Sequence, residues 1–223
     1  MKVAESIVGT LGHPSKMPGF SYGISAFLCN VGGNLRKVPG SVCSGCYART
    51  DWYATWRPLL AGHARRERGI RHPRWVELMV FMISTKCKKE PWFRWHDSGD
   101  LRGLWHFENI VKVCELTPDV RHWLPTREYE VVAAYIASGK TIPTNLVVRL
   151  SAHMIDEEPV VPDTLKHLPT STVSTAPASS MGMKLIEGKG SVECRAVEAR
   201  DNKCGACRAC WDSRVTNVSY PQH

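Results

Sequence analysis

The sequence predicts an α/β fold, and more narrowly a small or incomplete (β/α) barrel with a C-terminal cysteine-rich metal-binding segment. Three observations lead to this expectation. Short apolar segments alternate with segments of helical spacing, polar side chains follow the expected strand ends, and four cysteines gather near the C-terminus. The chain has 223 residues, whereas a full eight-fold barrel usually needs about 250.

The expected elements can be placed in chain order. Residues 1–50 are rich in Gly, Pro and Ser, and we interpret them as loops around one short strand, 23–28, which runs into Cys29. Asp51 is a suitable N-cap for a helix that continues to residue 68. The remaining expected helices are 75–86, 104–116 and 127–138, and the remaining strands are 92–96, 120–124, 145–150 and 171–174. Strands that alternate with helices imply parallel pairing through right-handed crossovers.

The bulk composition is that of a globular soluble protein, with 43% hydrophobic and 22% charged residues. No segment is apolar enough for a signal peptide or a membrane span, so we expect a cytoplasmic protein without a membrane partner. The net charge of +8 suits a nucleic-acid partner, with DNA as the expected form. The densest basic stretch, 63–72, supplies four candidate contact residues: Arg65, Arg66, Arg68 and Arg71. The sequence leaves the oligomeric state open.

The clearest chemical signal is the C-terminal set of cysteines. The nine cysteines of the chain are odd in number and clustered, which argues against a disulfide framework in a cytoplasmic protein. Four thiolates with close spacing are enough for a tetrahedral zinc site or for a cubane iron–sulfur cluster. The expected ligands are Cys194, Cys204, Cys207 and Cys210. Their spacing does not choose between zinc and iron–sulfur.

A second group of cysteines lies near the N-terminus. Cys43 and Cys46 are separated by two residues, and Cys29 lies upstream. Three thiolates can hold an iron–sulfur cluster with one iron left open, while a half-formed zinc knuckle or simple packing are the alternatives. Cys87 and Cys114 stand alone in segments of helical spacing, and we expect both in the core.

Polar side chains follow three of the expected strands, where parallel α/β folds place their active sites. His96, Asp97 and Asp100 are the candidate catalytic residues, because carboxylates and an imidazole can exchange protons near neutral pH. The candidate substrate-binding residues are Ser98, Gly99, Arg127, Glu128, Arg149 and Ser151. Alternation along strand 92–96 puts Trp95 on the face opposite Arg94 and His96. An N-cap and turn before the next helix would also explain the two acids.

Three of these motifs together resemble the phage "gene product 88" family. They are Cys-Tyr-Ala at 46–48, His-Asp-Ser-Gly-Asp at 96–100 and Cys-Gly-Ala-Cys-Arg-Ala-Cys-Trp at 204–211. The resemblance extends from about residue 29 to residue 212, and the C-terminal motif is its most specific part. If the chain is phage-encoded, its expected location is the cytoplasm of the host cell.

Two shorter motifs resemble the tRNA-guanine transglycosylases and their phage relatives that act on DNA. Asp97-Ser98-Gly99 is similar to their Asp-Ser-Gly turn, and residues 124–127 are similar to their Pro-Thr-Arg motif. The resemblance implies a zinc-bearing barrel that exchanges guanine for a 7-deazaguanine, with Asp97 as the general base. His122 and Trp123 occupy the positions before Pro-Thr-Arg where those enzymes carry a nucleophilic Asp, which leaves Asp100 as the candidate nucleophile.

The Cys-x-x-Cys-Tyr-Ala element also resembles radical S-adenosylmethionine (radical SAM) barrel proteins. That resemblance implies that Cys29, Cys43 and Cys46 hold the open cluster, and that the cysteines from 194 to 210 hold an auxiliary one. S-adenosylmethionine is then the expected cofactor. The gap between Cys29 and Cys43 is longer than in the usual compact motif.

The leading hypothesis from sequence is therefore an enzyme that exchanges guanine for a 7-deazaguanine base in DNA. A radical SAM enzyme acting on nucleic acid or a nucleotide is the first alternative, and a non-catalytic zinc protein that binds nucleic acid is the second. The expected organisation is a barrel-like catalytic domain over residues 1–190 with a metal-binding tail, 191–223, packed on it.

Overall fold

The structure is a computed structural model that describes residues 1–176, 191–196 and 202–222. Its centre is a parallel sheet of seven strands in the order β1-β2-β3-β4-β5-β7-β6. The mixed α/β class predicted from the alternation of strands and helices is therefore confirmed, and the sheet is open, with β1 and β6 at its edges. The strands are β1 (Phe20–Tyr22), β2 (Trp92–Trp95), β3 (Arg121–Thr126), β4 (Leu146–Ser151), β5 (Thr170–Ser174), β6 (Val192–Glu193) and β7 (Asn217–Pro221).

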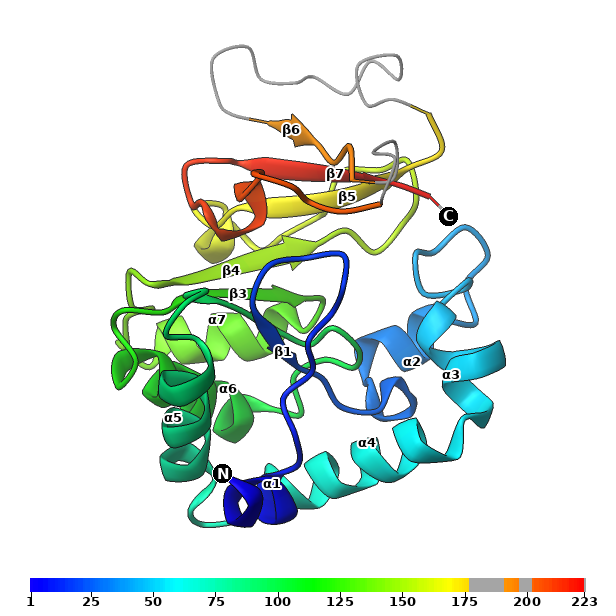
Figure 1. Ribbon diagram of the computed structural model, residues 1–223. Helices are drawn as coiled ribbons and strands as arrows, with labels where there is room; N and C mark the ends of the chain where they lie inside the picture. Colours follow the sequence, from blue (N-terminus) through cyan, green and yellow to red (C-terminus); the bar gives the residue numbers. More distant parts are fainter. Residues whose placement is uncertain (177–190, 197–201, 223) are drawn as a thin grey trace.

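Helices α5, α6 and α7 lie side by side along one face of this sheet (Figure 1). The described α-helices are α1 (Lys2–Val8), α2 (Val31–Leu35), α3 (Asp51–Thr55), α4 (Arg57–Gly69), α5 (Trp75–Lys86), α6 (Leu104–Glu115) and α7 (Tyr129–Ala137). Short 3-10 helices are η1 (Ala26–Leu28), η2 (Tyr47–Arg49), η3 (Asp163–Leu165) and η5 (Ala209–Trp211). Within the described ranges, none of the helices combines the length and the apolar character that crossing a bilayer requires.

The hydrophobic core lies between the sheet and these helices. Strand residues such as Phe93, Trp95 and Leu124 are fully buried there against Met79 and Phe107 of the helices. Alternate residues of a strand point to opposite faces, so Phe93 and Trp95 face this core while Trp92 faces the other side of the sheet. Cys87 and Cys114 are 2% and 0% exposed, and the expectation that both belong to the core is confirmed.

The opposite face of the sheet carries large polar and aromatic side chains and is covered by the C-terminal segment. The guanidinium of Arg94 lies 4.6 Å from the ring centroid of Trp123, and the Trp123 ring lies 5.1 Å from that of Trp211 in η5. The indole N–H of Trp211 donates to the Phe93 carbonyl at 3.0 Å. Residues 209–211 are thus part of the fold, and β7 pairs with β5 inside the sheet.

Two of the expected elements differ from the structure. The first strand occupies residues 20–22 rather than 23–28, because the amide of Ile24 already donates to the Ser98 carbonyl beyond the end of β2, and Ser25 then caps η1. The helix expected over 51–68 is divided at Trp56, since Pro58 has no amide hydrogen to continue the helical bonding.

The other expected elements agree more closely. Helix α5 has the predicted bounds, and the strands β2, β3, β4 and β5 begin or end within two residues of expectation. Strands β6 and β7 were not predicted. β6 has only two residues, and the polar sequence of β7 has no apolar alternation strong enough to stand out.

Candidate functional site

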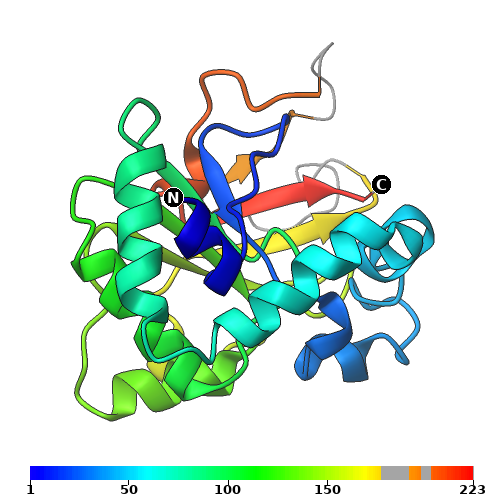
Figure 2. The same ribbon diagram turned by 60° about the horizontal axis from the view of Figure 1, so that its bottom comes forward.

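The N-terminal cysteines lie on a long loop that follows β1 and covers the carboxyl ends of the neighbouring strands. The arrowheads of β3 and β4 point toward the side of the molecule where α2 and α3 lie, and both views keep these two helices together (Figures 1 and 2). The amide of Val31 donates to the Glu128 carboxylate at 3.0 Å, and that of Val42 to the His153 carbonyl at 2.9 Å. The Arg102 guanidinium donates to the Leu28 carbonyl. The loop is therefore fixed to residues that follow β2, β3 and β4.

Cys29 and Cys43 both lie close to Gly32, where little space is left for a side chain. A Cβ atom on Gly32 would lie 3.2 Å from the Cβ of Cys29 and 3.3 Å from the Sγ of Cys43. The Sγ of Cys29 would be 3.8 Å from the same point. Cys43 is buried and Cys46 is half-buried on the turn that follows. The first two thiols thus lie close together around Gly32, with the third nearby.

The pKa values of Cys29 and Cys43 depend on their burial and on the charges of nearby groups. Burial raises the pKa of Cys29 to about 12, and the negative charges of Asp100, Cys43 and Cys46 add to the effect. Burial also raises the pKa of Cys43, while the guanidinium groups of Arg127 and Arg49 oppose that rise. A cation or a cationic cluster bound here would favour the thiolate forms.

Among the described residues, no three His, Cys, Asp or Glu side chains are grouped as ligands of one metal ion. In a cubane cluster, each thiolate would bind a different iron at a separate corner. Cys29, Cys43 and Cys46 are the three thiols that such a cluster would take here.

Asp100 connects the end of β2 with the end of β3. Its carboxylate accepts hydrogen bonds from the Thr126 hydroxyl at 2.6 Å, the Arg127 amide at 2.9 Å and the Leu101 amide at 2.8 Å. Burial raises the pKa of Asp100 to about 6, and these hydrogen bonds partly offset the rise. The side chain is only 7% exposed, so both oxygens are committed to holding the loop. Its expected role as a catalytic nucleophile stays a prediction, and these contacts show a structural role at the strand ends.

Asp97 remains accessible at the same edge. Its carboxylate accepts from the Ser21 hydroxyl at 3.0 Å and from the Ser98 amide at 3.2 Å, and the side chain is half-buried. The hydroxyl of Tyr47, which follows Cys46, donates to the Asp97 carbonyl at 2.8 Å. The structure therefore brings Asp97 and the cysteine loop together.

Three other expected site residues support the turn after β2 rather than facing a substrate. His96 leaves the strand with φ of 53° and its ring lies 5.5 Å from that of His106, so the expectation that it shares a face with Arg94 is wrong. Burial holds the pKa of His96 well below its usual range. The Ser98 hydroxyl donates to the Ile24 carbonyl at 2.8 Å, and a Cβ on Gly99 would lie 2.6 Å from the Ile24 side chain.

Of the expected site residues after β3 and at the end of β4, some make internal contacts and one, Arg127, stays accessible. Arg127 is half-buried and donates one guanidinium hydrogen to the Ala152 carbonyl at 3.0 Å, and Glu128 holds the cysteine loop as described. The Ser151 hydroxyl is buried and accepts from Ser171 at 3.1 Å. Of these, Arg127 is the side chain best placed to meet a ligand at the cysteine loop.

Arg149 was expected at the substrate site and is instead a structural anchor. Its side chain is 0% exposed. The guanidinium donates at 2.8–3.2 Å to four backbone carbonyls of the C-terminal part of the chain, those of Thr170, Ala209, Asp212 and Val215. The position on β4 points to the face covered by η5, and no hydrogen of these two terminal nitrogens is directed to the strand ends.

The C-terminal cysteines form a second group against the β6–β7 edge. The amide of Cys194 donates to the Ser219 carbonyl and that of Cys204 to the Lys16 carbonyl, while Cys207 is exposed on the turn after Cys204. The Sγ of Cys210 lies 3.1 Å from the Tyr220 hydroxyl. Burial raises the pKa of Cys194 and Cys204, and in each case the charge of Cys207 adds to it. The charges of these thiols thus act on one another, and their role as metal ligands stays a prediction.

The basic stretch on α4 is not uniform. Arg66 is buried, stacks over the Tyr22 ring at 5.5 Å and donates to the Thr10 and Gly23 carbonyls. Arg65, Arg68 and Arg71 are exposed. Arg66 is therefore corrected from a nucleic-acid contact to a core residue, since its guanidinium is already used inside the protein.

Sequence reasoning missed two residues near the candidate site. Gly32 is needed where Cys29 and Cys43 approach each other, and one glycine among many in a loop gives no separate signal. Arg94 lies on the sheet face opposite the helices; burial raises the pKa of Tyr47, Cys204 and Cys210, and the charge of Arg94 opposes that rise. A charged residue in an otherwise aromatic strand was a signal that could have identified it.

Comparison with known proteins identifies the family. The chain matches the family described as Gene product 88 over residues 10–213, which includes both cysteine groups and the turn after β2. No curated protein and no solved structure is significantly similar to the chain. The match covers most of the chain, and the protein belongs to the gene product 88 family.

Proposed function

We propose that this protein is a radical SAM-type iron–sulfur enzyme that acts on nucleic acid or a nucleotide. One observation carries the proposal: three cysteines lie on the loop after the first strand, and this loop is fixed over the carboxyl ends of β2, β3 and β4. Parallel α/β folds place their chemistry at that edge of the sheet. The order of the strands and the face covered by α5 to α7 support an incomplete (β/α) barrel as the finer description of the fold.

The roles of the residues follow from their positions. Cys29, Cys43 and Cys46 would hold a cubane cluster through three of its irons, and the cluster when bound supplies the electron for cleavage of S-adenosylmethionine, with an external reductant as its source. Glu128 fixes the cysteine loop through the Val31 amide. The charge of Arg127 opposes the rise in the pKa of Cys43. Arg127 is therefore available to hold the carboxylate of a ligand at the iron of the cluster that has no cysteine.

The C-terminal cysteines support a second, auxiliary metal group under the same proposal. Four thiols gather at the β6–β7 edge, and Arg94 lies near two of them and also near Tyr47 of the first cysteine loop. The charge of Arg94 therefore acts on residues of both cysteine groups. Thiolate ligands need reduced cysteines, and all nine cysteines are free, which supports a cytoplasmic location.

Base exchange with a 7-deazaguanine receives less support from the geometry. Asp97 is accessible and could act as a base, but the candidate nucleophile Asp100 has both oxygens committed to three donors. The non-catalytic zinc protein remains as the other candidate, and it leaves the position of the N-terminal cysteine loop unexplained. Metal identity separates these functions, because the zinc-bearing alternatives need no iron.

The decisive experiment is the iron, sulfide and zinc content of protein purified without oxygen, followed by an assay for reductive cleavage of S-adenosylmethionine. We expect iron with acid-labile sulfide, and we expect Cys43→Ser to lose the cluster of the first loop and the cleavage activity. Cys87→Ser is the matched control, because its thiol is buried in the core away from both groups. Zinc alone, with no cleavage by the wild-type protein after reconstitution with iron and sulfide, would refute the proposal.

A further inference from the structure

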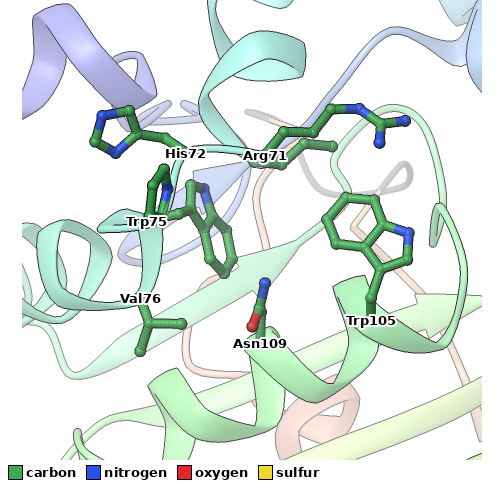
Figure 3. Close-up of a pocket in the computed structure, with 8 residues that line it drawn as sticks. Arg71, His72, Trp75, Val76, Trp105 and Asn109 are labelled. Carbon is green, nitrogen blue, oxygen red and sulfur yellow. The ribbon is translucent and has the colours of Figure 1, made fainter.

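A pocket of about 270 Å³ lies outside the cysteine groups, between the segment that joins α4 to α5 and the first turns of α6. Arg71, His72 and Trp75 line one side, and Trp105 and Asn109 of α6 line the other (Figure 3). Its volume suits a single nucleoside-sized group rather than a large cofactor. None of the roles proposed above uses this pocket.

The pocket has one accessible aromatic wall, Trp105, and a buried aromatic residue, Trp75, across from it. Figure 3 shows the indoles of Trp75 and Trp105 on opposite sides, with the Asn109 amide between them. Trp75 is 1% exposed and is held by its indole N–H, which donates to the Tyr22 hydroxyl at 3.4 Å, and by the Tyr22 ring at 6.0 Å. Trp105 is half-buried on the first turn of α6. A flat ring entering the pocket would meet the Trp105 indole, while Trp75 keeps the opposite side rigid.

Polar groups without a protein partner also face this space. Within the described residues, the Asn109 amide and the Trp105 indole N–H make no hydrogen bond, although both residues line the pocket. An Asn side chain offers a carbonyl acceptor and two N–H donors, the combination that pairs with the edge of a nucleobase. An accessible aromatic wall beside an amide therefore suits a base better than an aliphatic ligand.

The rim of the pocket is positively charged. The Arg71 guanidinium lies 5.1 Å from the Trp105 ring centroid and is exposed. Arg65 and Arg68 precede it at intervals of three residues and are also exposed, so they continue the charge along α4. The nearest acids in sequence are Glu67, which is half-buried on α4, and Glu77, which is paired with Arg74 at 2.6 Å. Phosphate groups would meet three exposed arginines against the one carboxylate of Glu67.

We propose that this pocket binds one nucleotide of a single-stranded nucleic acid, with the base against the Trp105 indole and the Asn109 amide and its phosphate at Arg71. The exposed arginines of α4 then bind the neighbouring phosphates. This site is independent of the metal chemistry, because binding needs neither cluster nor S-adenosylmethionine. The base and phosphate could also come from a free nucleotide, and the measurement separates these two sources.

The test is fluorescence anisotropy with a short labelled oligothymidine, with thymidine monophosphate as competitor. Asn109→Leu keeps the size of the side chain and removes its amide, and Trp105→Ala removes one wall. We expect each to weaken binding of the strand by about tenfold. Arg71→Ala should weaken binding and lower the dependence of log Kd on log salt by about one unit. Competition by the monophosphate at concentrations near the Kd of the strand would assign the pocket to a free nucleotide and overturn the strand assignment.

Arg121→Ala is the matched control for charge, since Arg121 is exposed at the start of β3, at the opposite end of the sheet from the loops that follow the strands. It should bind the strand as the wild type does. Circular dichroism would establish that Trp105→Ala is folded, and Asn109→Leu keeps the test valid if it is not. Wild-type affinity in folded Asn109→Leu and Arg71→Ala would overturn the proposal, whatever the iron content proves to be.

Discussion

The hydroxyl of Thr126 at the end of β3 donates to the carboxylate of Asp100 after β2 at 2.6 Å, inside the protein. Both residues belong to motifs that resemble parts of an active site, and the structure uses them to join two strand ends. The cysteine loop rests on the residues next to them, through Val31 and Glu128. Asp100, Thr126 and Glu128 thus support the cysteine loop, and the chemistry proposed for the loop belongs to its cysteines.

This relationship predicts the pH dependence of stability. Burial raises the pKa of Asp100 from 3.8 to about 6 in the folded protein, so the folded state binds the proton more tightly than the unfolded state. The contribution of Asp100 is therefore fully present below pH about 4 and is lost as the pH rises to about 6. The loss amounts to about 3 kcal/mol by the size of the shift.

Urea unfolding of wild type and Asp100→Asn between pH 4 and pH 7 measures this effect. The free energy of unfolding of the variant should not show this decline. The stability of the wild type relative to the variant should therefore fall as the pH rises. Parallel curves for the two proteins would contradict the assignment of the raised pKa to Asp100.

The crowding around Gly32 predicts a selective loss of metal. In Gly32→Ala, the new methyl would lie 3.3 Å from the Cys43 Sγ and 3.2 Å from the Cys29 Cβ, closer than most such contacts, so the cysteine side chains would have to move apart slightly. We expect iron bound by the N-terminal group to fall severalfold, with little change in the melting temperature. Gly45→Ala in the same loop is the control, because its Cβ meets no atom within 4 Å. Equal iron content in both variants would argue against a cluster beside Gly32.

Arg149 predicts a stability effect without a direct role in catalysis. Arg149→Met keeps an unbranched side chain but removes the guanidinium that donates to four carbonyls, of which those of Ala209 and Asp212 keep a backbone donor. We expect the free energy of unfolding to fall by about 3 kcal/mol, with faster hydrogen exchange in η5 and β7. Arg214→Met, in the same segment, removes an exposed ion pair with Asp212 and should cost less than about 1 kcal/mol. Similar losses in the two variants would refute the anchoring role.

Neighbouring arginines on α4 should separate structure from binding. Arg66→Ala removes two hydrogen bonds to carbonyls and the contact with the Tyr22 ring, and we expect a loss of about 2 kcal/mol in stability. Arg65→Ala should change stability by less than about 0.5 kcal/mol and weaken binding to a labelled DNA strand at low salt. The reverse pattern would show that Arg66 is the contact residue.

The sequence was most informative where one physical cause determines local structure. Alternation of apolar residues predicted the parallel sheet and nearly all of α5 to α7, since these elements bury one face each. It could not predict β7, whose polar residues are held by pairing with β5 rather than by their own pattern. Residue type likewise identified the two cysteine groups by their spacing.

Residue type was less informative about the side chains that follow the strands. His96, Asp100 and Arg149 have the chemistry of catalytic residues, but their surroundings assign them to internal contacts. Those surroundings come from segments distant in the sequence, such as Ile24 against Ser98 and Ala209 against Arg149. Composition and spacing cannot specify which donor will meet which acceptor across such distances.

The position of β7 has a consequence for the order of assembly. Strand β6 pairs with β7 and with no other described strand, yet β7 is made later in the chain. During synthesis on the ribosome, β2 to β5 each emerge after a partner strand, whereas β1 must wait for β2 and β6 must wait for β7. Cys194 follows β6 directly, and its amide donates to the Ser219 carbonyl of β7. Cys194 can therefore reach its final place only after β7, the last strand of the sheet to be made, has emerged.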